Sequence, residues 1–89
     1  DMKKKPGINM RNICGENIIV AEGNVNIDFT NILSLNESAA YLWQRIGDEH
    51  FDIDTLTQWL MEEYEVDIDT ARQDVIAMVD KWLELNIIE

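Results

Sequence analysis

The spacing of apolar residues changes once along the chain, from two residues to three or four. Up to Leu35, apolar and polar positions alternate, and Leu33 and Leu35 share one face, as expected for a β-strand. Beyond that point the apolar positions recur with helical spacing. Asn36 or Ser38 offers a side-chain oxygen to the first turn of this helix. The pattern therefore predicts a strand that leads directly into a helix over residues 37–46.

Two shorter strands are predicted before this one. Residues 8–13 alternate weakly, residues 17–22 contain a β-branched run, and residues 14–17 are typical of a turn. Together these segments indicate a β-hairpin. After a polar connection, residues 27–35 form the third predicted strand, with Leu33 and Leu35 among its core contacts.

Two more helices are predicted after the first. Asp52 and Asp54 are alternative N-caps for the second helix, whose apolar face is formed by Leu56, Trp59, Leu60 and Tyr64. Asp69 is the preferred N-cap for the third helix, which presents on one side Ala71, Val75, Met78, Val79, Trp82 and Leu85. Asn86 suits the left-handed conformation at the end of this helix, and Ile87 and Ile88 are expected to pack back onto the hairpin.

The third helix is apolar over more of its circumference than one small core requires. Ile76 and Leu83 lie well away from the centre of its apolar stripe. A helix that is apolar on more than one side is usually buried on more than one side, or it contacts another molecule. The sequence therefore indicates that this helix is either buried on a second side or contacts another molecule there.

The order of the predicted elements indicates an α+β fold, in which a three-stranded antiparallel sheet is followed by three helices. This order is typical of a winged helix-turn-helix variant with the hairpin placed before the helices. Residues 8–89 are expected to form one domain, because 89 residues are too few for two. Residues 1–7 are polar and basic, and we expect them to form a flexible tail.

The charge balance argues against nucleic-acid binding. The chain has 18 acidic and seven basic residues, which give a net charge of −11. Such a field repels phosphate backbones. No apolar run is long enough for a membrane-spanning helix, so we expect a cytoplasmic protein without a membrane contact.

The sequence offers little for catalysis or metal binding. Cys14 and His50 are the single cysteine and histidine, and neither has a partner at metal-ligand spacing. We expect Cys14 to be a half-buried residue beside a turn. The acids at residues 52, 54, 67 and 69 are better explained as helix caps than as a calcium loop, because the following residues lack the required glycine. We expect no enzymatic activity, no metal and no cofactor.

Several motifs resemble the PqqD-like family, small domains that recognise precursor peptides of ribosomally synthesised, post-translationally modified products. The resemblance covers most of the chain and rests on residues 35–40 with Trp43 (a Leu-Asn-x-x-Ala-Ala block followed by an aromatic), on residues 64–67, on Asp74-Val75, and on residues 85–88. Asn86 stands where the family usually has glycine. This departure is mild, because asparagine also tolerates the left-handed backbone.

The resemblance implies that the leader part of a precursor peptide adds as an extra strand to the third strand and lies against the third helix. This places the peptide-binding site on Thr30, Asn31, Ile32, Leu33 and Ser34, facing Arg72, Val75, Ile76, Val79 and Leu83. Independently, an edge strand has unpaired amides and carbonyls that an extended peptide can use. Asp74 matches an acid of the family's third helix, and it either binds a peptide base or holds the helix end.

The leading hypothesis is a non-catalytic peptide chaperone that binds a leader and presents it to a modifying enzyme, with radical S-adenosylmethionine enzymes as one candidate class. A winged-helix DNA-binding regulator is the alternative, but the third helix carries acids where that function needs bases. A homodimerisation module that pairs the same edge strand with its copy is the third hypothesis.

Overall fold

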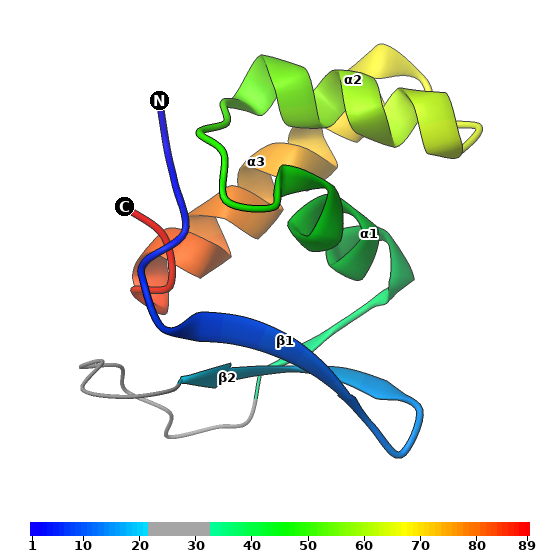
Figure 1. Ribbon diagram of the computed structural model, residues 1–89. Coiled ribbons are helices and arrows are strands. Elements are labelled where there is room, and N and C mark those ends of the chain that lie inside the picture. The colour runs from blue at the N-terminus through cyan, green and yellow to red at the C-terminus, as the bar shows by residue number, and fades with distance from the viewer. Residues whose placement is uncertain (22–32) are drawn as a thin grey trace.

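The computed structural model describes residues 1–21 and 33–89. A hairpin of β1 (Ile8–Ile13) and β2 (Glu16–Ala21) is joined by the short strand β3 (Ser34–Leu35), and three helices follow, namely α1 (Glu37–Ile46), α2 (Ile53–Glu63) and α3 (Ile68–Glu84) (Figure 1). The sheet is antiparallel with the order β1-β2-β3. The predicted α+β order of three strands and three helices is confirmed. Residues 27–32 of the predicted third strand lie outside the described residues.

A tight turn fixes the register of the hairpin. Ile13 pairs with Glu16, and the two residues between them, Cys14 and Gly15, both have positive φ angles of 53° and 82°. Two such residues match the right-handed twist of the strands they join. Cys14 is exposed rather than half-buried as predicted, because it lies in the turn itself and not in a strand beside the turn.

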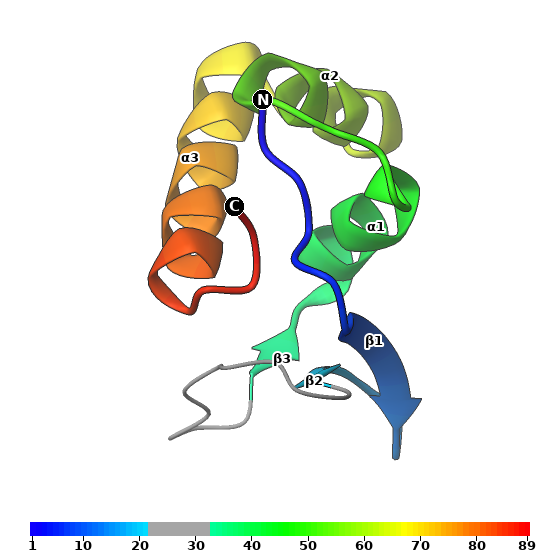
Figure 2. The same cartoon turned by 60° about the vertical axis from the view of Figure 1, so that its left-hand side comes forward.

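The first residues of the chain are paired with other segments, in contrast to the predicted flexible tail. The amide of Met2 donates to the carbonyl of Phe51 over 2.8 Å, and the amide of Lys5 donates to the carbonyl of Ile87 over 3.0 Å. Lys4 forms a bridge with Ile88, so the N-terminal segment runs antiparallel to the end of the chain. Figure 2 shows the two termini side by side between α3 and α1. Backbone pairing of this kind cannot be predicted from the order of apolar and polar side chains.

The core lies between the helices and the sheet, and two tryptophans meet at its centre. The rings of Trp43 and Trp82 contact edge to face, with centroids 5.2 Å apart and an interplanar angle of 87°. Around them, Leu42, Ile46 and Leu56 are completely buried. Trp59, also predicted as a core residue, is only half-buried and packs under the Arg45 guanidinium at 4.6 Å.

Each helix begins at a side chain that accepts a hydrogen bond from its first turn. Asn36 caps α1, Asp52 caps α2, and Asp67 caps α3 by accepting from the amide of Thr70 at 2.8 Å. The prediction that Asp69 caps α3 is wrong, because the helix starts two residues earlier. Asp69 instead lies in the first turn, where its negative charge interacts favourably with the positive end of the helix dipole.

The cap of α3 gives a testable pH dependence. The hydrogen bond from Thr70 lowers the pKa of Asp67, and the equivalent bond from Thr55 lowers the pKa of Asp52. A carboxyl with a depressed folded-state pKa stabilises the fold fully above its unfolded value of about 3.9, and this contribution is lost as the pH falls through the folded value. We expect Asp67→Ala, which removes the capping side chain, to lower the free energy of unfolding at neutral pH, and to lower it progressively less below pH ~4.

Urea unfolding at a series of pH values measures this difference. Asp69→Ala is the matched control, since it removes an acid from the same turn without removing the cap. An equal loss of stability in both variants would mean that the effect comes from the helix dipole and not from the cap.

Candidate functional site

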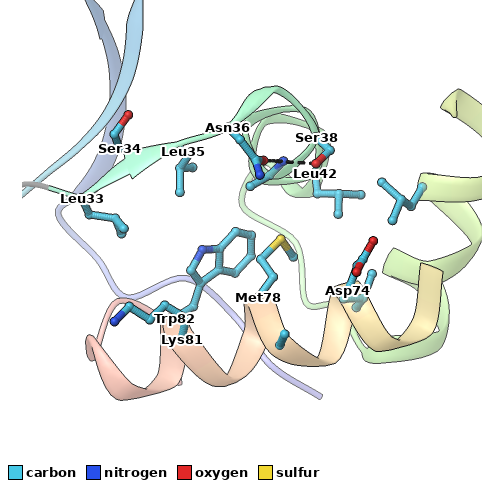
Figure 3. Close-up of a pocket in the computed structure, with 14 residues that line it drawn as sticks. Leu33, Ser34, Leu35, Asn36, Ser38, Leu42, Asp74, Met78, Lys81 and Trp82 are labelled. Atoms are coloured by element: carbon cyan, nitrogen blue, oxygen red, sulfur yellow. Dashed lines mark hydrogen bonds between the residues drawn. The ribbon is translucent and has the colours of Figure 1, made fainter. Parts of the chain in front are cut away.

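A hollow of about 480 Å³ lies between α3 and the segment that joins β3 to α1. Figure 3 shows its walls, with β3 and the start of α1 on one side and α3 on the other. Its lining residues are Leu33, Ser34, Leu35, Asn36, Ser38, Ala39, Leu42, Leu60, Asp74, Val75, Ala77, Met78, Lys81 and Trp82. We call this hollow the β3–α3 groove.

The base of the β3–α3 groove is apolar. Leu42, Val75 and Trp82 are buried core residues that also reach its surface. Leu33 and Met78 are half-buried along its sides. Ala77 is exposed and offers only a methyl group, so a bound chain could approach α3 closely at this point. The groove can therefore bury apolar side chains of a ligand.

The two ends of the β3–α3 groove carry opposite charges. Asp74 lies at the end near Ser38, and Lys81 lies at the end near Leu33 (Figure 3). Both side chains are exposed. Within residues 1–21 and 33–89, neither forms an ion pair or a side-chain hydrogen bond.

A second hollow of about 390 Å³ adjoins the acidic end of the groove. It shares with the groove Asn36, Ser38, Leu60 and Asp74, and it adds Glu37, Tyr64 and Val66. Burial and the nearby carboxylates of Glu37 and Glu63 raise the pKa of Tyr64. Two carboxylates, those of Glu37 and Asp74, therefore line this hollow.

One side of β3 is available for hydrogen bonding. Ser34 and Leu35 pair with Ile18 and Asn17 of β2, and the amide of Ile19 donates to the carbonyl of Leu33 over 3.0 Å. Because β3 is last in the order β1-β2-β3, no strand among the described residues pairs with its other side. That side presents amides and carbonyls that an extended chain could use.

The structure brings together some of the residues predicted for the peptide site. Leu33, Ser34 and Val75 line the β3–α3 groove. Val79 is in the core at 2% exposure, and Arg72 is ion-paired with Asp54 at a different hollow between α2 and α3. Ile76 and Leu83 are exposed on α3 but do not line the groove. Thr30, Asn31 and Ile32 lie outside the described residues.

Most of the groove-lining residues were not identified from the sequence as site residues, and on the exposed or half-buried part of α3 these are Ala77, Met78 and Lys81. Their spacing from Asp74 is three, four and seven, which places them on one side of the helix. This spacing could have indicated a common surface. This side of α3 has few large apolar residues, so the hydrophobic pattern indicated Ile76 and Leu83 as site residues instead.

No cluster of metal-ligating side chains and no membrane-spanning helix is found among the described residues. Over 1–21 and 33–89, no three of the His, Cys, Asp and Glu side chains are grouped as a metal site would require. The helices over the same ranges are too short or too polar to cross a bilayer.

Comparison with known proteins identifies relatives of the same fold. The chain matches a solved structure of "lasso peptide synthetase B1 complexed with the leader peptide" with 26% identity and a TM-score of 0.72, over 99% of this chain and 96% of that chain. A structure of "TbiB1 in complex with the TbiA(beta) leader peptide" has the same fold, with a TM-score of 0.75 and 15% identity over 98% of this chain and 94% of that chain.

The sequence itself assigns the family. No curated protein matches it significantly. The family model described as "Coenzyme PQQ synthesis protein D (PqqD)" matches residues 16–88, which include β2, all three helices and the closing isoleucines. The resemblance inferred from residues 35–40 and from the end of α3 is thereby confirmed. The chain belongs to the PqqD family.

Proposed function

We propose that this chain is a non-catalytic peptide chaperone, which binds the leader of a ribosomally made precursor peptide and presents it to a modifying enzyme. One observation carries the proposal. Leu33, Ser34 and Leu35 line an apolar groove, and one side of β3 has no partner strand among the residues that the structure describes, so one extended peptide can use both features.

Binding by strand addition explains how the two features act together. The peptide backbone hydrogen-bonds to Leu33 and its neighbours in β3, and this gives affinity with little dependence on sequence. Every second peptide side chain then points toward α3 and enters the groove, where Met78 and Trp82 form the apolar wall. Main-chain pairing supplies affinity, and the groove supplies selectivity.

The proposed partner that receives the leader is a separate enzyme. The family resemblance suggested radical S-adenosylmethionine enzymes as one class. The structural neighbour at 26% identity is a lasso peptide synthetase B1 bound to a leader peptide, so enzymes of lasso peptide synthesis are a second class. Co-purification of this chain with each candidate enzyme, with and without leader, distinguishes the two classes.

The competing hypotheses have weaker support. A DNA-binding regulator would need basic residues on α3, whereas α3 carries four acids, Asp69, Asp74, Asp80 and Glu84, against Arg72 and Lys81. The ion pair between Arg72 and Asp54 further reduces the positive field. Homodimerisation through β3 would use the same edge as the peptide, so it predicts that peptide binding dissociates a dimer.

Amide chemical shifts test the proposed binding mode. Labelled protein is titrated with the leader segment of the precursor peptide encoded beside this chain. We expect shifts at Leu33–Leu35 and along the Asp74, Met78 and Trp82 side of α3, because the added strand alters both the β3 hydrogen bonds and the groove wall. Amides of β1 and of α2 serve as internal controls.

Shifts confined to the hollow lined by Met61 and Ile68 would contradict the proposed site. Light scattering of the same samples measures the mass, and a dimer that persists with saturating peptide would favour the dimerisation module instead.

A further inference from the structure

Asp74 and Lys81 place opposite charges at the two ends of the β3–α3 groove. We propose that the leader carries a basic side chain beside Asp74 and an acidic side chain beside Lys81, with the base first in the peptide sequence. This inference rests on the proposed function, and it adds a substrate requirement that strand addition alone does not contain.

The first observation is the lack of a partner for Lys81. The chain has only seven basic residues against 18 acids, so an unpaired cation is unexpected. Lys3 pairs with Glu89, Arg45 with Glu62 and Arg72 with Asp54, while Lys4 lies over Trp43 and Lys5 donates to Asn86. Arg11 also has an interaction. In the part of the chain that the structure describes, Lys81 is the one basic side chain for which no ion pair, hydrogen bond or ring contact is found.

The second observation is the negative charge at the other end. Asp74 forms no ion pair or side-chain hydrogen bond within residues 1–21 and 33–89. It also lines the adjoining hollow together with Glu37. The acids that act as caps, Asp52 and Asp67, are by contrast engaged with their helices. Asp74 and Lys81 are thus both free to contact a ligand in the groove that they both line.

The geometry limits the spacing of the two peptide charges. Asp74 and Lys81 are seven residues apart on α3, which is about 10.5 Å along the helix axis. Only even separations in a strand place two side chains on the same face, and these correspond to about 7 Å for two residues and about 13.5 Å for four. Long side chains on both partners can reach either position. The leader's base and acid are therefore two or four residues apart.

The direction follows from the sheet. β3 runs from the Lys81 end of the groove to the Asp74 end (Figure 3), and the sheet is antiparallel throughout. A strand that continues this antiparallel pattern runs from the Asp74 end to the Lys81 end, with the better hydrogen-bond geometry of the two orientations. The base therefore precedes the acid. A leader with the reverse order places like charges together at both ends.

A charge-swap experiment tests this inference. The probes are two versions of the leader segment from the adjacent precursor, which have identical composition and carry one Arg and one Glu four residues apart in either order. The protein variant combines Asp74→Lys with Lys81→Asp, which reverses the groove charges and leaves the net charge unchanged. Fluorescence anisotropy measures Kd for all four combinations.

We expect the natural protein to prefer the base-first peptide by roughly tenfold, because two partly exposed ion pairs change from attraction to repulsion. The swapped protein should prefer the acid-first peptide by a similar factor, and both preferences should decrease at high salt. Asp80→Asn, which removes an acid of α3 outside the groove, should leave the preference unchanged.

The other outcomes separate this inference from the proposed function. Equal affinities of the two peptides for the natural protein would overturn the charge requirement while the chaperone function stands. A preference for the acid-first peptide in the natural protein would overturn the assigned direction. No binding of either peptide at millimolar concentration would contradict the chaperone function itself, and this inference with it.

Discussion

Trp43→Ala is expected to leave most of the protein unfolded at room temperature. The Trp43 side chain is 2% exposed, contacts the Trp82 ring at 5.2 Å, and lies beneath the Lys4 ammonium at 4.3 Å. Truncating a buried tryptophan to alanine costs about 3–5 kcal/mol, because apolar contacts are lost and a cavity remains. Small domains lie at the low end of the usual stability range of about 5–15 kcal/mol. The loss is thus close to the whole stability of the fold.

Urea unfolding followed by circular dichroism measures the effect. Trp59→Ala provides a matched control, since the same atoms are removed from a half-buried side chain of α2 that packs against the outside of the core and beneath Arg45. We expect the control to remain folded with a smaller loss of stability. Equal destabilisation by the two substitutions would mean that the core does not centre on the Trp43–Trp82 contact.

The sequence predicted the helices well because their signals are local. Helix α1 begins at Glu37 and ends at Ile46 as expected, and Gly47 follows it with a φ of 57°. Asn86 has the predicted left-handed conformation, with a φ of 66°. A cap residue and an apolar stripe act within one or two turns of the helix, so the sequence of the helix and its flanking residues is enough to predict where it begins and ends.

Features that depend on distant segments were missed. Backbone hydrogen bonds join Met2–Lys5 to Phe51 and to the end of the chain. The side-chain contacts of Lys3 with Glu89 and of Lys5 with Asn86 accompany this pairing and link residues more than 80 positions apart in the sequence. The lysines of this segment have side-chain charges typical of a tail, yet burial lowers the pKa of Lys4, with Asp48 opposing the shift. No pattern of side chains reports which backbone groups meet.

The side of α3 that lines the β3–α3 groove shows the same limit in another form. The sequence placed Ile76 and Leu83 away from the core-facing side of α3, and both side chains are indeed exposed. It could not tell which side faces β3. The side that faces β3 depends on how α3 is rotated about its axis relative to α1 and the sheet. The side that lines the groove includes Asp74 and Ala77, and neither is a large apolar residue that a hydrophobic pattern would detect.

Ala77→Trp is expected to weaken leader binding on the order of a hundredfold while the fold remains intact. Ala77 is exposed in the middle of the groove wall, between Asp74 and Lys81. An indole at this position occupies the space that peptide side chains would fill, so the peptide loses its apolar contacts and is pushed away from β3. Since Ala77 is not a core residue, the larger side chain requires no repacking of the interior.

Ile76→Trp is the matched control, because it places the same ring on the adjacent residue, which is 39% exposed and outside the groove. Calorimetric titration of both variants with the adjacent precursor's leader, together with their circular dichroism spectra, separates blocked binding from unfolding. If Ile76→Trp instead abolishes binding and Ala77→Trp does not, the leader lies on the Ile76 and Leu83 side that the sequence predicted. The two neighbouring substitutions therefore decide which side of α3 recognises the peptide.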